Sequence, residues 1–363
     1  MRIATIKDNE QLIDLCKLAP MEGVVTAYVD QSPDFFAMPS IQGESFRVWV
    51  EEYESRITAC VVETHKTINY DGKTYKAFYF GDLKVRPENR GTLGLRISSQ
   101  IVKKAKDQGF AIGECFVIDG NDKMMKVIEY LGTKIYTHVL SGKADIYQIM
   151  PYKTYSIPKG YSVRTAKESD IDEICRILET QYRNYTASPV FTKNTLLEII
   201  YKTPGFTIEN FRVAEKNGKI VAVASFWDQN AIRRTIIKKI SKKAKMFLKF
   251  LKILNPFFSI PHIPKEGDSL KYVYLRFPAT FDNDIKGLEA IITTECNRLR
   301  KLKKYHFVWA GFHEADILSQ SIKKMWKMSM KVNIIHFKFN DEVKLIDPET
   351  HKTKPVYVDF SIV

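Results

Sequence analysis

The stretch VRPENRGTLGLR, residues 85–96, holds the residues whose types and spacing most clearly predict chemistry. Its pattern predicts the end of a strand, a glycine-containing turn and the first turn of a helix. The first N–H groups of a helix have no intrahelical partner and lie at the positive end of the helix dipole, so they attract phosphate groups. We therefore expect an anion-binding loop made of Arg90, Gly91, Thr92, Leu93, Gly94 and Leu95.

No pattern in the sequence indicates a metal site. The pair His313-Glu314 begins an H-E-x-x-H pattern, but Ile317 stands where the second histidine would be, so we assign no metal site. The five cysteines are scattered and odd in number, which favours reduced, buried thiols and a cytoplasmic protein. They are Cys16, Cys60, Cys115, Cys175 and Cys296.

Composition indicates two globular domains in a chain of 363 residues, of which 45% are hydrophobic and 27% charged. No apolar run approaches the roughly 20 residues that cross a bilayer, and the N-terminal residues do not have the pattern of a secretory signal. The net charge of +14 implies attraction to anions such as nucleotide phosphates, an acidic partner or a lipid surface.

The elements that must position the loop follow from periodicity. Residues 46–85 alternate as three antiparallel strands with a hairpin turn at Asp71-Gly72. After the loop we expect a helix over 93–108, a strand over 110–118 and a helix over 122–131. This order predicts an α/β (α+β) domain in which helices flank a mixed, largely antiparallel sheet.

An internal repeat divides the chain. IATIKDNEQLIDLCKL (3–18) is similar to VRTAKESDIDEICRIL (163–178), and Asn217-Gly218 predicts a second hairpin. Proline and glycine residues between 151 and 160 mark a boundary, so we expect domains over 1–155 and 156–363. In the second domain, YHFVWAGF predicts a strand, ADILSQSIKKMWKM a helix and VYVDFSIV a closing strand.

Two motifs resemble the GCN5-related N-acetyltransferase superfamily, and the repeat resembles a tandem pair of such domains. FGDLKVRPENRG is similar to the family's fourth strand and V-x-P-x-x-R-G joint, and NDKMMKVIEYLG to a later helix. The resemblance implies binding of acetyl-CoA or another acyl-CoA by the strand residues Leu83, Lys84 and Val85, by the loop 90–95 and by Asn121. It also implies direct acyl transfer to an amine, with Asp82 or Glu114 as catalytic base.

The chain departs from the family pattern at three positions. Leu93 and Leu95 occupy places where the family has small residues, so either Gly94 offers the loop in a shifted register or the two leucines crowd the phosphate out. Ile128 replaces the tyrosine that often protonates the departing thiolate, and Tyr130 lies about 200° away around the helix. The alternative for Asp82 and Glu114 is that they are solvated or capping carboxylates without a catalytic role.

The second domain lacks the loop, and Asp282 and Asp284 would repel a pyrophosphate at that place, so we expect one cofactor site. The resulting hypothesis is an acyl-CoA-dependent, acetyl-CoA-preferring N-acyltransferase that acts on a small-molecule or peptide amine. The alternative from another class is a non-catalytic scaffold or acyl-CoA sensor. Tandem copies of this fold also transfer aminoacyl groups from transfer RNA, but no motif here indicates that activity.

A basic insertion near residues 231–264 contains no acidic residue up to Pro264. Isoleucine, phenylalanine and leucine recur at helical spacing among lysines, so we expect an amphipathic helix over 231–254. It could contact an anionic membrane or an acidic partner, or pack its apolar face on its own domain. Nucleic acid is not favoured, because aromatic and basic residues do not alternate as a base-stacking strand requires.

Overall fold

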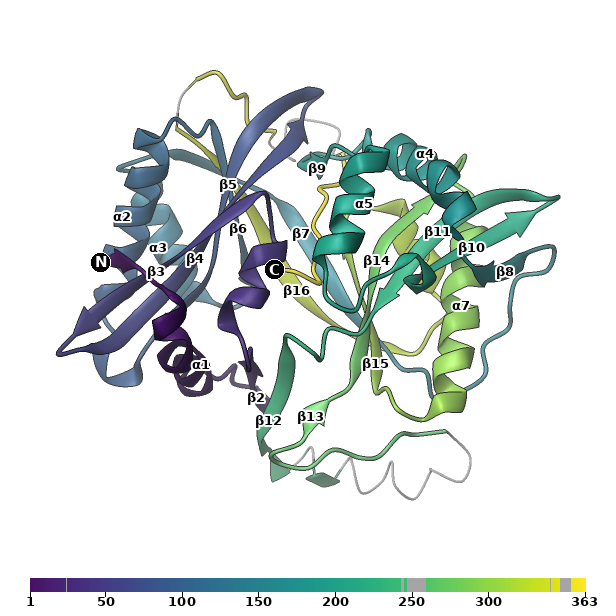
Figure 1. Ribbon diagram of the computed structural model, residues 1–363, viewed down its shortest axis with the longest axis horizontal. Coiled ribbons are helices and arrows are strands. Elements are labelled where there is room, and N and C mark those ends of the chain that lie inside the picture. The colour runs from purple at the N-terminus through teal and green to yellow at the C-terminus, as the bar shows by residue number, and fades with distance from the viewer. Residues whose placement is uncertain (24, 243–244, 247–258, 340, 347–353) are drawn as a thin grey trace.

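The computed structural model describes residues 1–23, 25–242, 245–246, 259–339, 341–346 and 354–363. Its strands form one large sheet, which runs through the whole molecule, and a second sheet of three strands (Figure 1). No helix in these ranges is long and apolar enough to span a membrane.

The first half of the chain, residues 1–155, follows the predicted order of elements closely. Its helices are α1 (Asn9–Leu18), α2 (Leu93–Asp107) and α3 (Asp122–Gly132). Its strands are β1 (Arg2–Ile3), β2 (Val25–Asp30), β3 (Ser45–Tyr53), β4 (Arg56–Tyr70), β5 (Lys73–Val85), β6 (Ile112–Ile118) and β7 (Thr137–Ile149). The hairpin at Asp71-Gly72 joins β4 to β5, as expected.

The second half, residues 156–363, repeats this order with fewer matches to prediction. Its helices are α4 (Ile171–Tyr182), α5 (Lys193–Lys202) and α7 (Ile285–Leu302). Its strands are β8 (Ser162–Thr165), β9 (Ser188–Pro189), β10 (Phe211–Lys216), β11 (Lys219–Trp227), β12 (Arg234–Ile240), β13 (Ser269–Leu270), β14 (Tyr272–Thr280), β15 (Phe307–His313) and β16 (Lys327–Lys338). The helix predicted over ADILSQSIKKMWKM is wrong: a short 3₁₀ turn, Ile317–Ile322, is followed by β16.

The repeat seen in the sequence extends to individual contacts. The guanidinium of Arg2 donates to Asp8 at 2.8 Å, and the guanidinium of Arg164 donates to Asp170 at 2.6 Å. Each aspartate precedes a helix and also accepts a backbone N–H three residues before it. Asp170 therefore stands at the N-terminal boundary of α4 as Asp8 does at that of α1.

The two halves share one sheet because they exchange strands. The order is β1-β3-β4-β5-β6-β16-β7-β15-β14-β11-β10-β8, and only β5–β6 and β14–β15 pair in parallel. Strand β16 of the second half lies between β6 and β7, whereas β7 of the first half pairs with β15 (Figure 1). The two expected sheets are thus joined through their middle strands.

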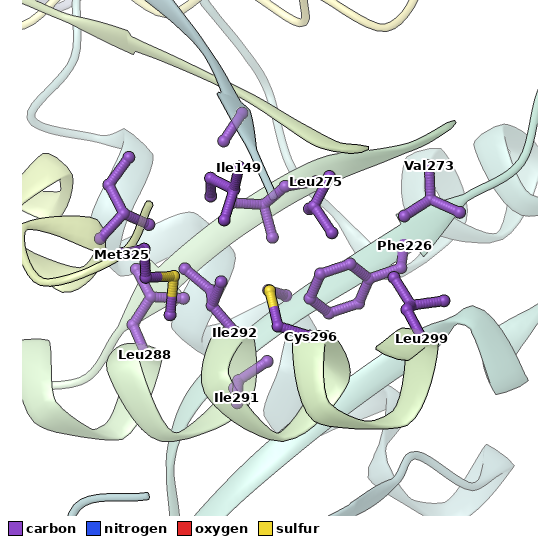
Figure 2. Packing of buried hydrophobic residues seen from close by; sticks show 14 of the residues in the cluster. Ile149, Phe226, Val273, Leu275, Leu288, Ile291, Ile292, Cys296, Leu299 and Met325 are labelled. Atoms are coloured by element: carbon purple, nitrogen blue, oxygen red, sulfur yellow. The ribbon is translucent and has the colours of Figure 1, made fainter. Parts of the chain in front are cut away.

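Helices cover both faces of this sheet. In the first half, α1 packs on one face with Val48 and Cys60, and α2 and α3 pack on the other with Phe78 and Phe80. In the second half, α7 packs on strands β11 and β14 and also contacts Ile149 of β7 (Figure 2). Strand β7 therefore belongs to the core of the second half as well.

The helix predicted over residues 231–254 is wrong at its beginning, where β12 forms instead. Strand β12 pairs with β2 of the first half from Arg234↔Asp30 to Ile240↔Val25. The run RTIIKKI contains three isoleucines and a threonine, and β-branched residues favour a strand when a strand edge is available. The remainder of that prediction falls partly on residues 243–244 and 247–258, which lie outside the described ranges.

Candidate functional site

Strands β5 and β6 separate at the centre of the first half. They pair in parallel from Ala77↔Ile112 to Tyr79↔Glu114 and no further, although β5 continues to Val85. At the same level, the pairing of β4 with β5 shifts register, and Asp82 adopts a left-handed conformation with φ of 54°. The bulge and the separation leave the backbone of β5 without a strand partner on the side of β6 from Phe80 onward.

The predicted anion-binding loop lies beyond this opening. Gly91 has φ of 125°, which favours glycine, and α2 begins two residues later. In the described part of the chain, the N–H groups of Thr92, Leu93, Gly94 and Leu95 have no hydrogen-bond partner, so they remain available to an anion.

The side chains of the two leucines do not occupy the space in front of the free N–H groups of the loop. Leu93 and Leu95 are partly buried against the core that α2 covers. Gly94 lies over Leu83 and Val85, and a Cβ there would be 3.9 Å from each side chain. Arg90 is exposed and forms no ion pair in the described residues, so its guanidinium can meet a phosphate.

Asp82 lies at the bulge in a cluster of charges. Lys84 Nζ is 2.7 Å from its carboxylate, and Gln31 Nε2 donates to it at 2.8 Å. Burial disfavours the carboxylate, but the charges of Lys84 and Arg233, together with these hydrogen bonds, outweigh burial and lower the pKa of Asp82 to about 2. Asp82 is therefore ionised at neutral pH and a weak base.

Glu114 is buried behind Lys66. The ammonium of Lys66 forms an ion pair with its carboxylate, and His336 Nε2 lies 3.7 Å from the other oxygen. Burial by itself raises the pKa of Glu114, yet the charge of Lys66 and the contact with His336 lower it below its ordinary value. The opposite ring nitrogen of His336 hydrogen-bonds Ser141 Oγ at 2.7 Å, so the polar chain continues inward.

An apolar cavity of about 340 Å³ lies between the two halves on the Tyr79 side of β5. Lys66 is on its wall, but neither Asp82 nor Glu114 lines it. Helix α5 and the C-terminal residues 357–363 supply much of the remaining wall. The cavity thus lies along β4 and β5, and residues of the second half close it.

Comparison with solved structures identifies this arrangement. Saccharomyces cerevisiae N-myristoyltransferase with bound myristoyl-CoA superposes with a TM-score of 0.61 at 14% identity, covering 98% of this chain and 89% of that chain. A GCN5-related N-acetyltransferase from Anabaena variabilis gives a TM-score of 0.51 at 10% identity, covering 93% and 71%. The chain has the GCN5-related N-acetyltransferase fold. No protein-family model and no curated protein sequence matches it.

Other residues singled out by the acetyltransferase pattern have structural contacts as well. Asn121 caps α3, because its side chain accepts the N–H of Met124 at 3.2 Å. Ile128 is fully buried, and its carbonyl accepts the hydroxyl of Tyr136 at 3.0 Å. Tyr130 is 52% exposed and lies on the outside of α3, away from the core that buries Ile128.

The second acetyltransferase-like half carries the same bulge but not an open slot. Strands β14 and β15 pair only as far as Tyr274↔Trp309, and residues 356–360 lie against the separated ends. Phe360 lies over Gly311 so closely that a Cβ there would be 2.0 Å from the ring. The expected closing strand is therefore a plug, with a single bridge between Thr186 and Val356.

Asp284 of the second half lies at the start of a helix, as expected. Asp284 caps α7 by accepting the N–H of Gly287 at 3.0 Å and also accepts the hydroxyl of Tyr161 at 2.7 Å. A carboxylate therefore occupies the helix N-terminus that an anion would need. This geometry supports the expectation of one cofactor site.

Sequence reasoning missed the partners of the two carboxylates. Gln31, Lys66, Arg233 and His336 come from separate segments and meet only through the sheet and the interface between the halves. No local motif marks them. In the described residues, no group of three or more His, Cys, Asp or Glu side chains gathers as for a metal ion.

Proposed function

We propose that this chain is an acyl-CoA-dependent N-acyltransferase whose first half binds the acyl-CoA. The observation that carries the proposal is the opening between β5 and β6 together with the free N–H groups at the start of α2. A pyrophosphate on residues 90–95 would direct the rest of the cofactor along Leu83 to Val85 toward the bulge. The names of the structural neighbours, an N-myristoyltransferase and an N-acetyltransferase, agree with this chemistry.

The acceptor amine would enter from the cavity and attack the thioester carbon, so that the C–N bond forms as the C–S bond breaks. The ammonium of the acceptor must lose one proton to a base before it attacks, and the second proton, which the nitrogen loses as the amide forms, goes to the departing thiolate. Asp82 is our first candidate for the base that takes the proton from this ammonium, since its ionised carboxylate lies at the bulge. Glu114 is the second candidate and would act through Lys66, which lines the cavity.

Calorimetry with acetyl-CoA and with longer acyl-CoA esters tests the binding step. We expect binding to the wild-type chain and a loss of about ten-fold or more in affinity for Arg90→Glu, since a charge-assisted hydrogen bond contributes about 1.5–3 kcal/mol. Arg183→Glu, at an exposed residue directly after the C-terminal end of α4, is the matched charge reversal and should bind as the wild type does. Equal affinity in the Arg90 variant would contradict the loop assignment.

A second candidate function is binding without turnover. Ile128 at the usual position of the general acid and the low pKa of Asp82 favour it. Mass spectrometry with acetyl-CoA and a library of amines distinguishes the two: an acylated product that Asp82→Ala abolishes identifies an enzyme. Tight acyl-CoA binding without product in any pairing identifies a sensor or scaffold.

We place the protein in the cytoplasm, a proposal supported by five cysteines that are all free and buried. An anionic surface or acidic partner at the basic insertion also stays a proposal. Among its described residues, Lys238, Lys239 and Lys242 are exposed. Binding to vesicles with and without anionic lipid would test it.

A further inference from the structure

The cavity between the halves is lined by both aromatic and branched aliphatic side chains. Five aromatic side chains line it. Tyr79, Phe116 and Phe277 come from strands β5, β6 and β14, and Phe191 and Tyr357 come from the segments that close the cavity. Its volume of about 340 Å³ lies near the low end of the roughly 300–1,000 Å³ typical of small-molecule sites. The cavity therefore suits a compact apolar body.

The charges on the walls are nearly all paired. Lys66 forms an ion pair with the buried Glu114. Lys202 lies 2.5 Å from Glu198, and Arg276 lies 2.7 Å from Asp359. These three are the cations that line the cavity, so no wall cation is left for an acidic ligand in the described part of the chain.

Glu44 differs from the other charged residues of the wall. It is exposed at the cavity, its Oε1 accepts the N–H of Thr67 at 2.8 Å, and it has no cationic partner among the described residues. The wall thus presents one unpaired negative charge. A cation is attracted to such a cavity, and a carboxylate is repelled.

We propose that this cavity binds an acceptor that carries one primary amine on an aromatic or branched apolar body and has no acidic group. The inference rests on the proposed N-acyltransferase function and names the substrate class for it. Tyr79 lines the cavity, and its hydroxyl lies over Gly81, where an added Cβ would be 2.2 Å from it, so this ring borders both the cavity and the residue next to Asp82. An amine bound with its body among the rings would reach the slot past this ring.

The first experiment compares matched acceptors on the full chain with acetyl-CoA. Tryptamine and phenethylamine should give kcat/KM about ten-fold or more above tryptophan and phenylalanine, which add only a carboxylate. Glu44→Gln should reduce that ratio several-fold. Equal rates for the amines and the amino acids would overturn the proposal.

The second experiment makes the cavity smaller by placing a larger side chain at its exposed edge. Val190 lines it and is 44% exposed, so Val190→Trp adds bulk without entering the core. We expect about a ten-fold loss in kcat/KM for tryptamine, with KM for acetyl-CoA unchanged. Leu197→Trp, on exposed α5 outside the cavity, is the matched control and should behave as the wild type. A changed preference for acyl-chain length with unaltered amine kinetics would instead make the cavity the acyl pocket and refute the proposal.

Calorimetry with tryptamine separates this inference from the proposed function. If no donor yields product but tryptamine binds and Val190→Trp weakens its binding, the transferase proposal fails and the ligand class stands. If product forms from other amines while tryptamine neither binds nor reacts, the ligand class fails and the transferase proposal stands.

Discussion

Asp82 and Phe277 occupy equivalent positions in the two halves of the chain. Asp82 has φ of 54° in the bulge of β5, and Phe277 has φ of 53° in the bulge of β14. Parallel pairing with the next strand ends three residues before each of them: β5 pairs with β6 only as far as Tyr79, and β14 pairs with β15 only as far as Tyr274. The same backbone therefore presents a carboxylate in the first half and an aromatic ring, packed in a core, in the second.

Lys84→Met should raise the pKa of Asp82 by about 1–3 units, because it removes the nearest positive charge from the carboxylate. The ionised fraction of Asp82 would then fall at a higher pH, and the acid limb of kcat/KM would move upward with it. Carbon NMR titration of labelled aspartate measures the midpoint directly. Lys238→Met, an exposed change on β12, should leave it in place, and an unchanged midpoint in Lys84→Met would show that Arg233 and Gln31 suffice.

Lys66→Met and Glu114→Gln should lower kcat/KM by similar factors of about ten, and the double variant should be no worse than either single one. This follows if Glu114 acts only by positioning Lys66, which alone of the two lines the cavity. Urea denaturation of each variant corrects for lost stability. A much larger effect of Glu114→Gln than of Lys66→Met would indicate direct proton transfer to Glu114.

Gly311→Ala should displace the plug of the second half. The added Cβ would meet the Phe360 ring at 2.0 Å, and overpacking of this kind costs about 1–3 kcal/mol of unfolding free energy. Thermal unfolding and limited proteolysis near the C-terminus would record it. Gly23→Ala is a suitable control, since its Cβ would meet only Val25 O at 3.5 Å. Equal melting temperatures for the Gly311 variant and the wild type would contradict the packing of residues 356–360.

Asp316→Asn should stabilise the protein above pH 6. Burial raises the pKa of Asp316 from 3.8 to about 6, against hydrogen bonds from Leu318 N–H and Tyr185 that lower it. The stability that the protonated side chain contributes is therefore complete below about pH 4 and is lost as pH rises through 6. Asparagine can accept the same two hydrogen bonds without a charge.

We expect the Asp316 variant to gain up to about 2–3 kcal/mol at pH 8 and to match the wild type near pH 4. Urea denaturation at both values checks this. A stability difference that does not change between pH 4 and pH 8 would show that Asp316 does not titrate in this range.

The local patterns predicted most of the first half, because its strands and helices follow one another along the chain. The alternation of apolar and polar residues predicted strands β3, β4 and β5, and apolar residues at helical spacing predicted helices α2 and α3. The loop that we propose as the anion site was predicted from a short motif, since its candidate donors are consecutive backbone groups. These features need no information about distant residues.

The failures arose where distant strands decide the outcome. The isoleucines of β12 recur at helical spacing, yet the edge of β2 makes them a strand. The helix predicted over residues 315–328 is replaced by a short 3₁₀ turn, and its last two residues already belong to β16, which pairs with β6 and β7. For the same reason the partners of Asp82 and Glu114 could not be predicted: Arg233 and His336 come from the second half.

The exchange of strands also constrains how the chain can fold during synthesis. The edges of β6 and β7 face each other only through β16, which is among the last elements to be made. Until residues 327–338 have been synthesised, the first half has two open strand edges and Glu114 has no His336 beside it. The opening between β5 and β6 therefore gains its final support only when the chain is almost complete. A polypeptide truncated before β16 would form an open sheet rather than a smaller working domain.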